Sequence, residues 1–157
     1  MPTMIEGEAS ARNLQLAIVA SGYYPAITER LLSGAVEALT VHGAEEGNIT
    51  VFRVPGSFEI PQMARKVAGQ KKYDAIICLG VLIRGETLHF ELISRECAGG
   101  VQQVAADFGI PVTFGVITAD TMEQAMERAG ERSENKGWEA ALAAIEMANA
   151  YKRLTRP

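Results

Sequence analysis

The chain has 157 residues, of which 48% are hydrophobic and 22% are charged, and its formal net charge is −4. This composition is typical of one globular domain and argues against a disordered chain. The acidic balance excludes the electrostatic footprint of a protein that binds nucleic acid or an anionic membrane, although a local basic site for one small anion stays compatible with it.

No segment of the sequence resembles a membrane span or a secretory signal. The longest apolar run, 75–83, has nine residues, whereas a membrane-spanning helix needs about 20. Residues 1–12 have neither a basic region nor an apolar run. Cys78 and Cys97 form no CxxC motif, and we expect both to be small buried hydrophobic residues. The expected protein is cytoplasmic, with no membrane segment.

Residues 1–12 are polar, show no clear period and are expected to form an N-terminal arm before a single domain at 13–157. Within that domain, short apolar runs indicate strands, and apolar residues three or four positions apart indicate helices. In chain order the predicted elements are a strand at 14–20, a helix at 27–39, a strand at 49–54, a helix at 58–68, a strand at 75–83, a helix at 90–108, a strand at 112–118, a helix at 121–130 and a helix at 138–148.

The 75–83 strand is apolar on both faces, as expected of a parallel strand covered by helices on each side. Alternating strands and helices predict right-handed βαβ units. The expected fold is therefore an α/β three-layer sandwich, with a four-stranded parallel sheet flanked by helices on both faces. Ligands bind such sheets at the carboxyl ends of the strands. That rule directs attention to the loops at 21–26, 55–59, 84–90 and 118–121.

The first two of these loops offer aromatic rings and a helix N-terminus. Tyr23 and Tyr24 could stack on a planar heterocycle, or they could cover the edge of the core. Ser57 is expected to cap the following helix, whose free N–H groups could bind ligand oxygens. Glu59 is either an ordinary complement to the helix dipole or a ligand group.

The 84–90 loop carries the most chemistry. Gly85 and the amides after it could wrap an anion at a helix N-terminus, with a hydroxyl from Thr87 and a nearby positive charge from Arg84. Glu86 would oppose an anion unless its side chain points outward. His89 is the only histidine at a strand-end loop, so it is the candidate general acid and base, with a structural role as the alternative.

Two cations are misplaced for a monomer. Arg128 lies at the far end of a predicted helix, and Lys136 begins the last helix, where the dipole disfavours a positive charge. Either both are solvated, or both meet an anionic ligand, including one held by a neighbouring subunit. The sequence has no P-loop and no GxGxxG motif, which gives weak support for nucleoside triphosphate or dinucleotide binding.

Five stretches in order resemble the lumazine synthase family: VPGSFEIP at 54–61, KKYDAIICLGVLIRGETLHFELIS at 71–94, PVTFGVIT at 111–118, EQAMERAG at 123–130 and NKGWEAALAAIEMAN at 135–149. The resemblance covers nearly the whole chain from residue 13 onward. It implies a flavodoxin-like fold and an enzyme of riboflavin biosynthesis. That enzyme condenses 5-amino-6-(D-ribitylamino)uracil with 3,4-dihydroxy-2-butanone 4-phosphate and releases phosphate and water, with no metal or organic cofactor.

The resemblance also implies a role for each matching residue. The pyrimidine and its ribityl chain would contact Tyr23, Ser57, Phe58, Glu59 and the main chain of Val81, Leu82 and Ile83. The phosphate would contact the loop of Gly85, Glu86 and Thr87, and His89 would transfer protons. The adjacent subunit would supply Phe114, Lys136 and the phosphate ligand Arg128. The family often has an aromatic residue followed by Asn in the first loop, where this chain has Tyr23-Tyr24.

The resemblance further implies homopentamers with active sites between adjacent subunits. The short segment at 130–135 favours twelve pentamers in an icosahedral shell, and whether such a shell encloses riboflavin synthase stays open. Three alternatives remain: a flavin- or pyrimidine-binding module without catalysis, a shell protein whose catalysis is secondary or lost, and an archaeal-type riboflavin synthase.

Overall fold

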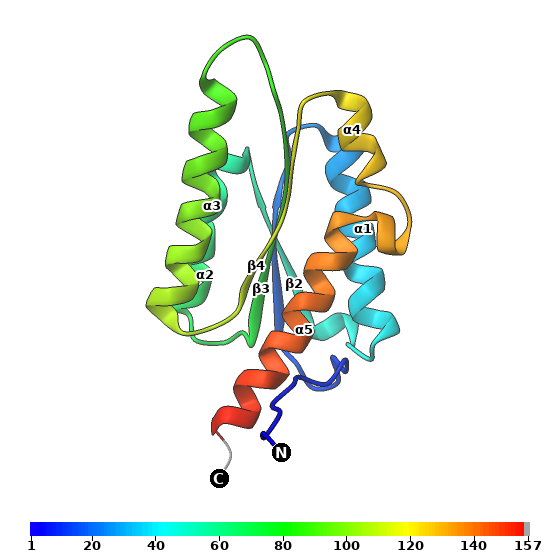
Figure 1. Ribbon diagram of the computed structural model, residues 1–157, viewed down its shortest axis with the longest axis vertical. Helices are drawn as coiled ribbons and strands as arrows, with labels where there is room; N and C mark the ends of the chain where they lie inside the picture. The colour runs from blue at the N-terminus through cyan, green and yellow to red at the C-terminus, as the bar shows by residue number, and fades with distance from the viewer. Residues whose placement is uncertain (156–157) are drawn as a thin grey trace.

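The four strands lie side by side in one parallel sheet of order β2-β1-β3-β4 (Figure 1). The computed structural model describes residues 1–155. Its strands and helices are β1 Leu16–Ser21, α1 Pro25–Val41, β2 Ile49–Val54, α2 Ile60–Gly69, β3 Ala75–Ile83, α3 His89–Phe108, β4 Val112–Ala119, α4 Met122–Glu127 and α5 Lys136–Thr155, with single 3₁₀ turns η1 Glu46–Asn48, η2 Ser57–Glu59 and η3 Arg132–Glu134. The predicted three-layer α/β fold is confirmed.

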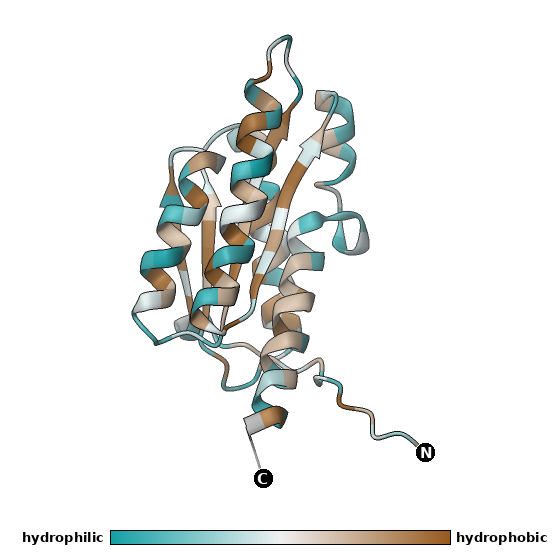
Figure 2. Ribbon diagram, turned by 60° about the vertical axis from the view of Figure 1, so that its left-hand side comes forward, coloured by the Kyte–Doolittle hydropathy of each residue, from teal (hydrophilic) through white to brown (hydrophobic). Residues whose placement is uncertain are grey.

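Helices α2 and α3 cover one face of the sheet, and α1 and α5 cover the other (Figure 1). Each face has its own apolar core, with Ile77 and Leu79 of β3 on the α1 and α5 side and Ile76 and Cys78 on the α2 and α3 side. Hydrophobic residues run along the strands, while hydrophilic and hydrophobic residues alternate along α2 and α3 (Figure 2). The central strand β3 is buried on both faces because helices cover both, as its unbroken apolar sequence predicted.

The ends of some elements differ from the sequence-based expectation. Helix α4 stops at Glu127 instead of reaching Gly130. The chain leaves the helix there because Gly130 N–H donates to the carbonyl of Glu134 at 3.0 Å and Ala129 forms a bridge with Asn135. The capping prediction at its start is confirmed, since Thr121 Oγ1 accepts from the N–H of Gln124 at 3.1 Å.

Both cysteines are buried and free, on the α2 and α3 side of the sheet. Burial raises the pKa of the Cys78 thiol and raises the pKa of Cys97 to about 12. The interpretation of both as small hydrophobic residues is confirmed.

Residues 1–12 form no helix or strand, and their later part, 6–10, lies beside α5, where Asn149 Nδ2 donates to the carbonyl oxygens of Glu8 and Ser10 and Arg153 Nη1 donates to that of Glu6. Among residues 1–155, no helix combines the length and the apolar character that crossing a membrane requires.

Candidate functional site

A cleft of about 730 Å³ opens at the carboxyl ends of β1, β2 and β3, where the rule for parallel sheets predicted it. We call it the strand-end cleft. The turn after β1, the loop after β2, the end of β3 and the first turns of α3 line it with Tyr23, Tyr24, Pro55, Gly56, Ser57, Phe58, Glu59, Val81, Leu82, Ile83, Gly85, Thr87, His89, Phe90, Leu92 and Ile93. Four separate chain segments thus bring most of the predicted site residues together.

Two tyrosines form one wall of the strand-end cleft. Their ring centroids lie 4.9 Å apart, edge to face, and the side chain of Tyr23 is exposed. Tyr24 precedes α1 with φ 55° and ψ 64°, the left-handed region. Asn tolerates this region better than other non-glycine residues do, which gives a physical reason for the Asn that the resemblance associates with this position. Tyr24 adopts the same backbone conformation at a higher steric cost.

The loop after β2 lies against β3 and carries a hydroxyl with no protein partner. Ser57 is buried, and among residues 1–155 its Oγ has no hydrogen-bond partner. The expectation that Ser57 caps the following helix is wrong, because neither η2 nor α2 has a side-chain cap. The turn around Ser57 is 3₁₀, and α2 begins three residues later, at Ile60. Ser57 thus lines the cleft with a buried hydroxyl that has no protein partner among the described residues.

The loop before α3 brings Gly85, Thr87 and His89 to the cleft. Thr87 Oγ1 accepts from the N–H of His89, the first residue of α3, at 3.3 Å. The side chain of His89 is exposed at the cleft, so it can reach a bound molecule. Glu86 is exposed and does not line the cleft. Its carboxylate therefore does not oppose an anion there.

Arg84 does not supply the free positive charge expected beside this loop. Its Nε donates to Asp120 at 2.8 Å and its Nη1 donates to Glu91 at 3.1 Å, while its guanidinium lies 4.8 Å from the ring centroid of Phe90. The hydrogen bond to Asp120, and to a smaller extent the one to Glu91, raises the pKa of Arg84. The two carboxylates neutralise its charge, and the residue joins the ends of β3 and β4 to the start of α3.

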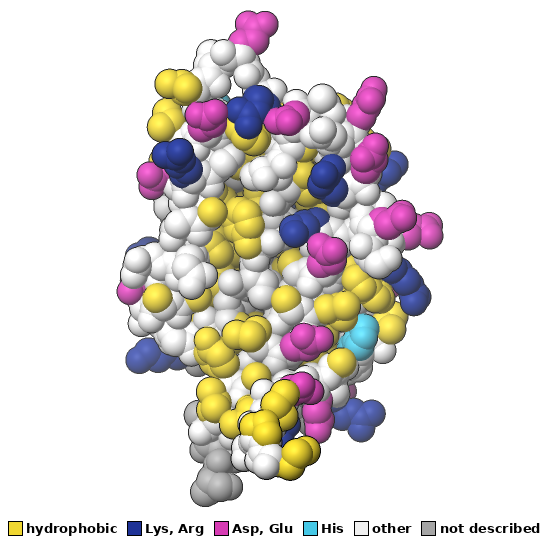
Figure 3. Space-filling view, in the orientation of Figure 1, with side chains coloured by type: hydrophobic (Ala, Val, Ile, Leu, Met, Phe, Trp, Pro, Cys, Tyr) yellow, Lys and Arg dark blue, Asp and Glu magenta, His cyan; other side chains and the backbone are white. Residues whose placement is uncertain are grey.

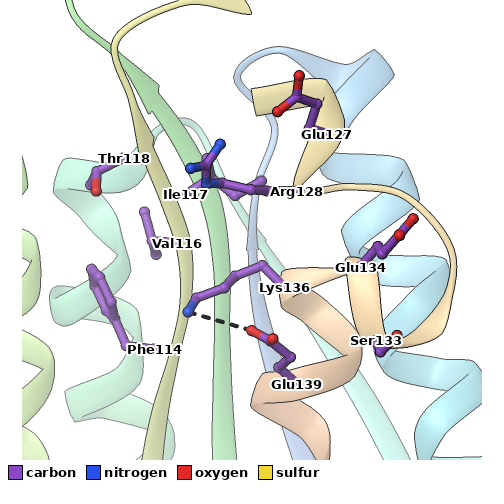
Figure 4. A pocket seen from close by; sticks show the side chains of 10 residues that line it. All are labelled: Phe114, Val116, Ile117, Thr118, Glu127, Arg128, Ser133, Glu134, Lys136 and Glu139. Carbon is purple, nitrogen blue, oxygen red and sulfur yellow. Dashed lines mark ion pairs between the residues drawn. The ribbon is translucent and has the colours of Figure 1, made fainter. Parts of the chain in front are cut away.

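A second cleft, of about 810 Å³, lies along the outer edge of the sheet, and we call it the β4-edge cleft. Strand β4, the end of α4, η3 and the start of α5 line it with Phe114, Val116, Ile117, Thr118, Glu127, Arg128, Ser133, Glu134, Lys136 and Glu139. The side chains of Arg128, just after α4, and Lys136, the first residue of α5, both extend toward β4 (Figure 4). The residues that the resemblance assigns to an adjacent subunit are thus together, but in a different cleft from His89.

Each cation in the β4-edge cleft has a weak side-chain contact. Arg128 Nη1 donates to the carbonyl of Gln124 at 2.9 Å, and Lys136 Nζ lies 3.5 Å from Glu139 Oε2. The residues in both contacts are exposed or partly exposed, so these contacts contribute little stability. On this side of the molecule, hydrophobic side chains lie near the middle of the surface, with basic and acidic side chains beside them (Figure 3). The cleft also has three carboxylates, Glu127, Glu134 and Glu139, so its positive charge is confined to the ends of the Arg128 and Lys136 side chains.

Sequence reasoning missed three apolar residues of the strand-end cleft, Phe90, Leu92 and Ile93. Phe90 and Ile93 fitted the predicted core face of the third long helix. The first turns of α3 extend beyond the edge of the sheet, however, so these side chains line the cleft and only Cys97, Val101 and Val104 of this helix are fully buried. The sequence did contain one signal for this cleft. Leu92 is apolar but lies outside the three- and four-residue spacing of the predicted core face.

Known proteins match this chain over the residues of both clefts. The sequence profile of the 6,7-dimethyl-8-ribityllumazine synthase family matches residues 13–152. A protein of Syntrophus aciditrophicus (strain SB), described as 6,7-dimethyl-8-ribityllumazine synthase, is 47% identical over 154 residues, which are 98% of this chain and 100% of the relative. The profile spans every residue that lines either cleft.

Proposed function

The chain belongs to the 6,7-dimethyl-8-ribityllumazine synthase family, and we propose that it assembles its active site from the strand-end cleft of one subunit and the β4-edge cleft of the next. The protein is an enzyme, a transferase of riboflavin biosynthesis. It condenses 5-amino-6-(D-ribitylamino)uracil with 3,4-dihydroxy-2-butanone 4-phosphate, releasing phosphate and water. One observation carries the shared site: Arg128 and Lys136 line a cleft that has no lining residue in common with that of His89.

The strand-end cleft suits the pyrimidine and its ribityl chain. The ring of Tyr23 can lie against the heterocycle, and the main chain of 81–83 offers hydrogen bonds at its edge. The ribityl hydroxyls would meet Ser57, Phe58 and Glu59. The unpartnered Oγ of Ser57 supports this assignment, because a buried hydroxyl gains a hydrogen bond only from what enters the cleft.

The loop of Gly85, Glu86 and Thr87 would hold the phosphate through its main-chain amides and the Thr87 hydroxyl, with Arg128 of the adjacent subunit opposite. Phe114 and Lys136 of that subunit would close the site over the pyrimidine. Holding the amine of one substrate against the ketone of the other lowers the barrier by proximity. Positive charge and N–H donors around the leaving phosphate stabilise the charge that develops as it departs.

His89 would move the protons of imine formation, phosphate elimination and ring closure. A positioned histidine contributes roughly 100-fold or more to such transfers. None of these three steps transfers electrons, and each needs only proton movement and charge stabilisation. We therefore expect the reaction to need no metal and no organic cofactor.

The assembly that follows from a shared site is a homopentamer, and the short connection through η3 favours twelve pentamers in a shell. Light scattering of the purified protein tests this. The shell predicts a mass of sixty chains of 16.9 kDa each. A mass of five chains would refute the shell and keep the shared site, whereas a fully active monomer would refute the shared site.

The activity itself is tested by mixing the purified protein with both substrates. Lumazine absorbance and fluorescence are followed together with phosphate release. We expect product and phosphate in equal amounts, well above the uncatalysed background. Tight binding of the pyrimidine without turnover would instead favour a binding module or a shell protein that has lost catalysis.

A further inference from the structure

One buried amide side chain is hydrogen-bonded to the backbone beside the two cations of the β4-edge cleft. Asn135 is 2% exposed, immediately before α5. Its Oδ1 accepts from the N–H groups of Gly137 at 2.8 Å and Trp138 at 3.1 Å. Its Nδ2 donates to the carbonyl of Gly130 at 2.9 Å and to that of Arg30 on α1 at 3.1 Å. The amide thus uses both acceptor positions and both donor hydrogens.

These four hydrogen bonds join three parts of the chain. The acceptor side caps α5, which begins with Lys136. The donor side holds the 130–134 loop and ties it to α1. Next to this amide, the N–H of Lys136 donates to the carbonyl of Arg128 at 2.8 Å. The backbones that carry the two cations are therefore in direct contact, and Asn135 determines where both stand relative to α1.

The backbones of α1 and the start of α5 pack closely around the Asn135 side chain. A Cβ added to Gly34 of α1 would lie 2.4 Å from Asn135 Oδ1, and one added to Gly137 would lie 2.1 Å from the carbonyl oxygen of Leu31. Helix α1 and the start of α5 are thus in backbone contact. On the surface of the same loop, Arg132 forms an exposed ion pair with Glu37 at 3.1 Å, and its guanidinium lies 5.2 Å from the ring centroid of the buried Trp138.

We propose that Asn135 is a positioning residue for the reaction: its amide sets the separation and direction of Arg128 and Lys136, and so fixes the anion-binding half of the shared site. This inference rests on the proposed function of those two cations. Asn135 itself lines neither cleft. It acts through the backbone of the loop, and a displacement of about 1 Å at a reacting centre can cost roughly 100-fold in rate.

The test separates the two sides of the amide. Asn135→Ser keeps an oxygen that can cap α5 but removes both Nδ2 donors, so the loop loses its internal anchor while the helix keeps its start. Asn135→Asp keeps the size and the cap but turns an oxygen toward the two carbonyls. For both variants we expect the KM for 3,4-dihydroxy-2-butanone 4-phosphate to rise by about tenfold or more. The assembly mass should stay unchanged.

Gly34→Ala provides a second, independent variant. It changes no hydrogen-bonding group and lies on a helix that contributes no residue to the β4-edge cleft, yet its methyl group would displace Asn135. We expect the same rise in KM. Arg132→Ala is the matched control on the same loop, and its KM should stay at the wild-type value because Arg132 lines neither cleft and its ion pair with Glu37 is exposed.

The outcomes distinguish the inference from the function on which it rests. A purely structural role for Asn135 would reduce the amount of active enzyme, and therefore the apparent kcat, but would leave KM unchanged. That result, alongside a raised KM in Arg128→Ala, would overturn the inference alone. A wild-type KM in Arg128→Ala and Lys136→Ala would overturn the proposed site and the inference together.

Discussion

The backbone of Gly80 on β3 passes so close to Ser57 that a Cβ at Gly80 would lie 2.8 Å from the Ser57 hydroxyl oxygen. A side chain on β3 at this point would displace the loop that follows β2. The contact seats Ser57 at the wall of the strand-end cleft, and its hydroxyl has no hydrogen-bond partner among residues 1–155. The unpaired Ser57 hydroxyl thus lowers the stability of the fold, whereas in the proposed site the same hydroxyl strengthens binding of the substrate.

Replacing Ser57 by Ala should separate these two effects. A buried hydroxyl without a partner costs about 1–3 kcal/mol, so the free energy of unfolding of Ser57→Ala should stay unchanged or rise. The KM for the pyrimidine should rise by roughly three- to tenfold, because a hydrogen bond to the ribityl chain is worth about 1 kcal/mol. Chemical denaturation and steady-state kinetics measure the two quantities.

The matched control for Ser57→Ala is Ser94→Ala. The hydroxyl of Ser94, on α3, is also buried without a partner among the described residues, but Ser94 does not line the cleft. It should show the same absence of destabilisation and a wild-type KM. Equal KM values for wild type and Ser57→Ala would remove Ser57 from the ribityl site.

His89→Ala should slow turnover without abolishing it. Proton transfer by a positioned side chain contributes roughly 100-fold or more to kcat, whereas the positioning of the two substrates by the rest of the site should survive. His42→Ala is the control, because this second histidine caps α1 through Nδ1, 2.6 Å from the Ala38 carbonyl, and lines neither cleft. Equal kcat values for His89→Ala and wild type would exclude the proton-transfer role.

Arg128→Ala should impair use of the phosphorylated substrate more than use of the pyrimidine, because the guanidinium is the proposed phosphate ligand. A shared site makes a further prediction for mixed oligomers. Reassembling Arg128→Ala chains with His89→Ala chains creates some sites that have both wild-type residues, so the mixture should be more active than either parent. Activity that only averages the two parents would place both residues in one subunit's site.

The buried thiols predict a pH dependence. Burial raises the pKa of Cys97 to about 12 and that of Cys78 as well, so the folded protein keeps both protonated where unfolded thiols ionise, near pH 8.5. The contribution of the two protonated thiols to the free energy of unfolding is fully present below that pH. It falls as the pH rises toward the pKa of the folded thiols. At pH 8 a thiol reagent should label Cys78 and Cys97 slowly in the native protein. In denaturant it should label both rapidly. Rapid native labelling would contradict the burial.

The order of elements, and most of the strand-end cleft, followed from the sequence. Strand β3 was predicted at its observed bounds. In a chain that alternates strands and helices, nine apolar residues between polar ones indicate a strand buried on both faces. The loops that line the cleft followed from the topology, since parallel strands end at one edge of the sheet. These predictions succeed because they depend on residues that are neighbours in the chain.

Other features depended on distant residues, and only the tertiary structure decided them. Arg84 and Asp120 are 36 positions apart, so no local pattern shows that the charge of Arg84 is already neutralised. Ser57 has the side chain of a helix cap, but it lies in a 3₁₀ turn close to Gly80, and its hydroxyl has no partner in the described part of the chain.

The sequence by itself determined that Arg128 and Lys136 are cations in unusual places, and their motifs indicated the family. That they share a cleft depends on a loop closed by Asn135 and held against α1 across 105 positions of sequence. Local periodicity reports which residues face a core, because burial repeats with the geometry of a helix or strand. It does not report which segments meet, because that depends on how the complete chain packs.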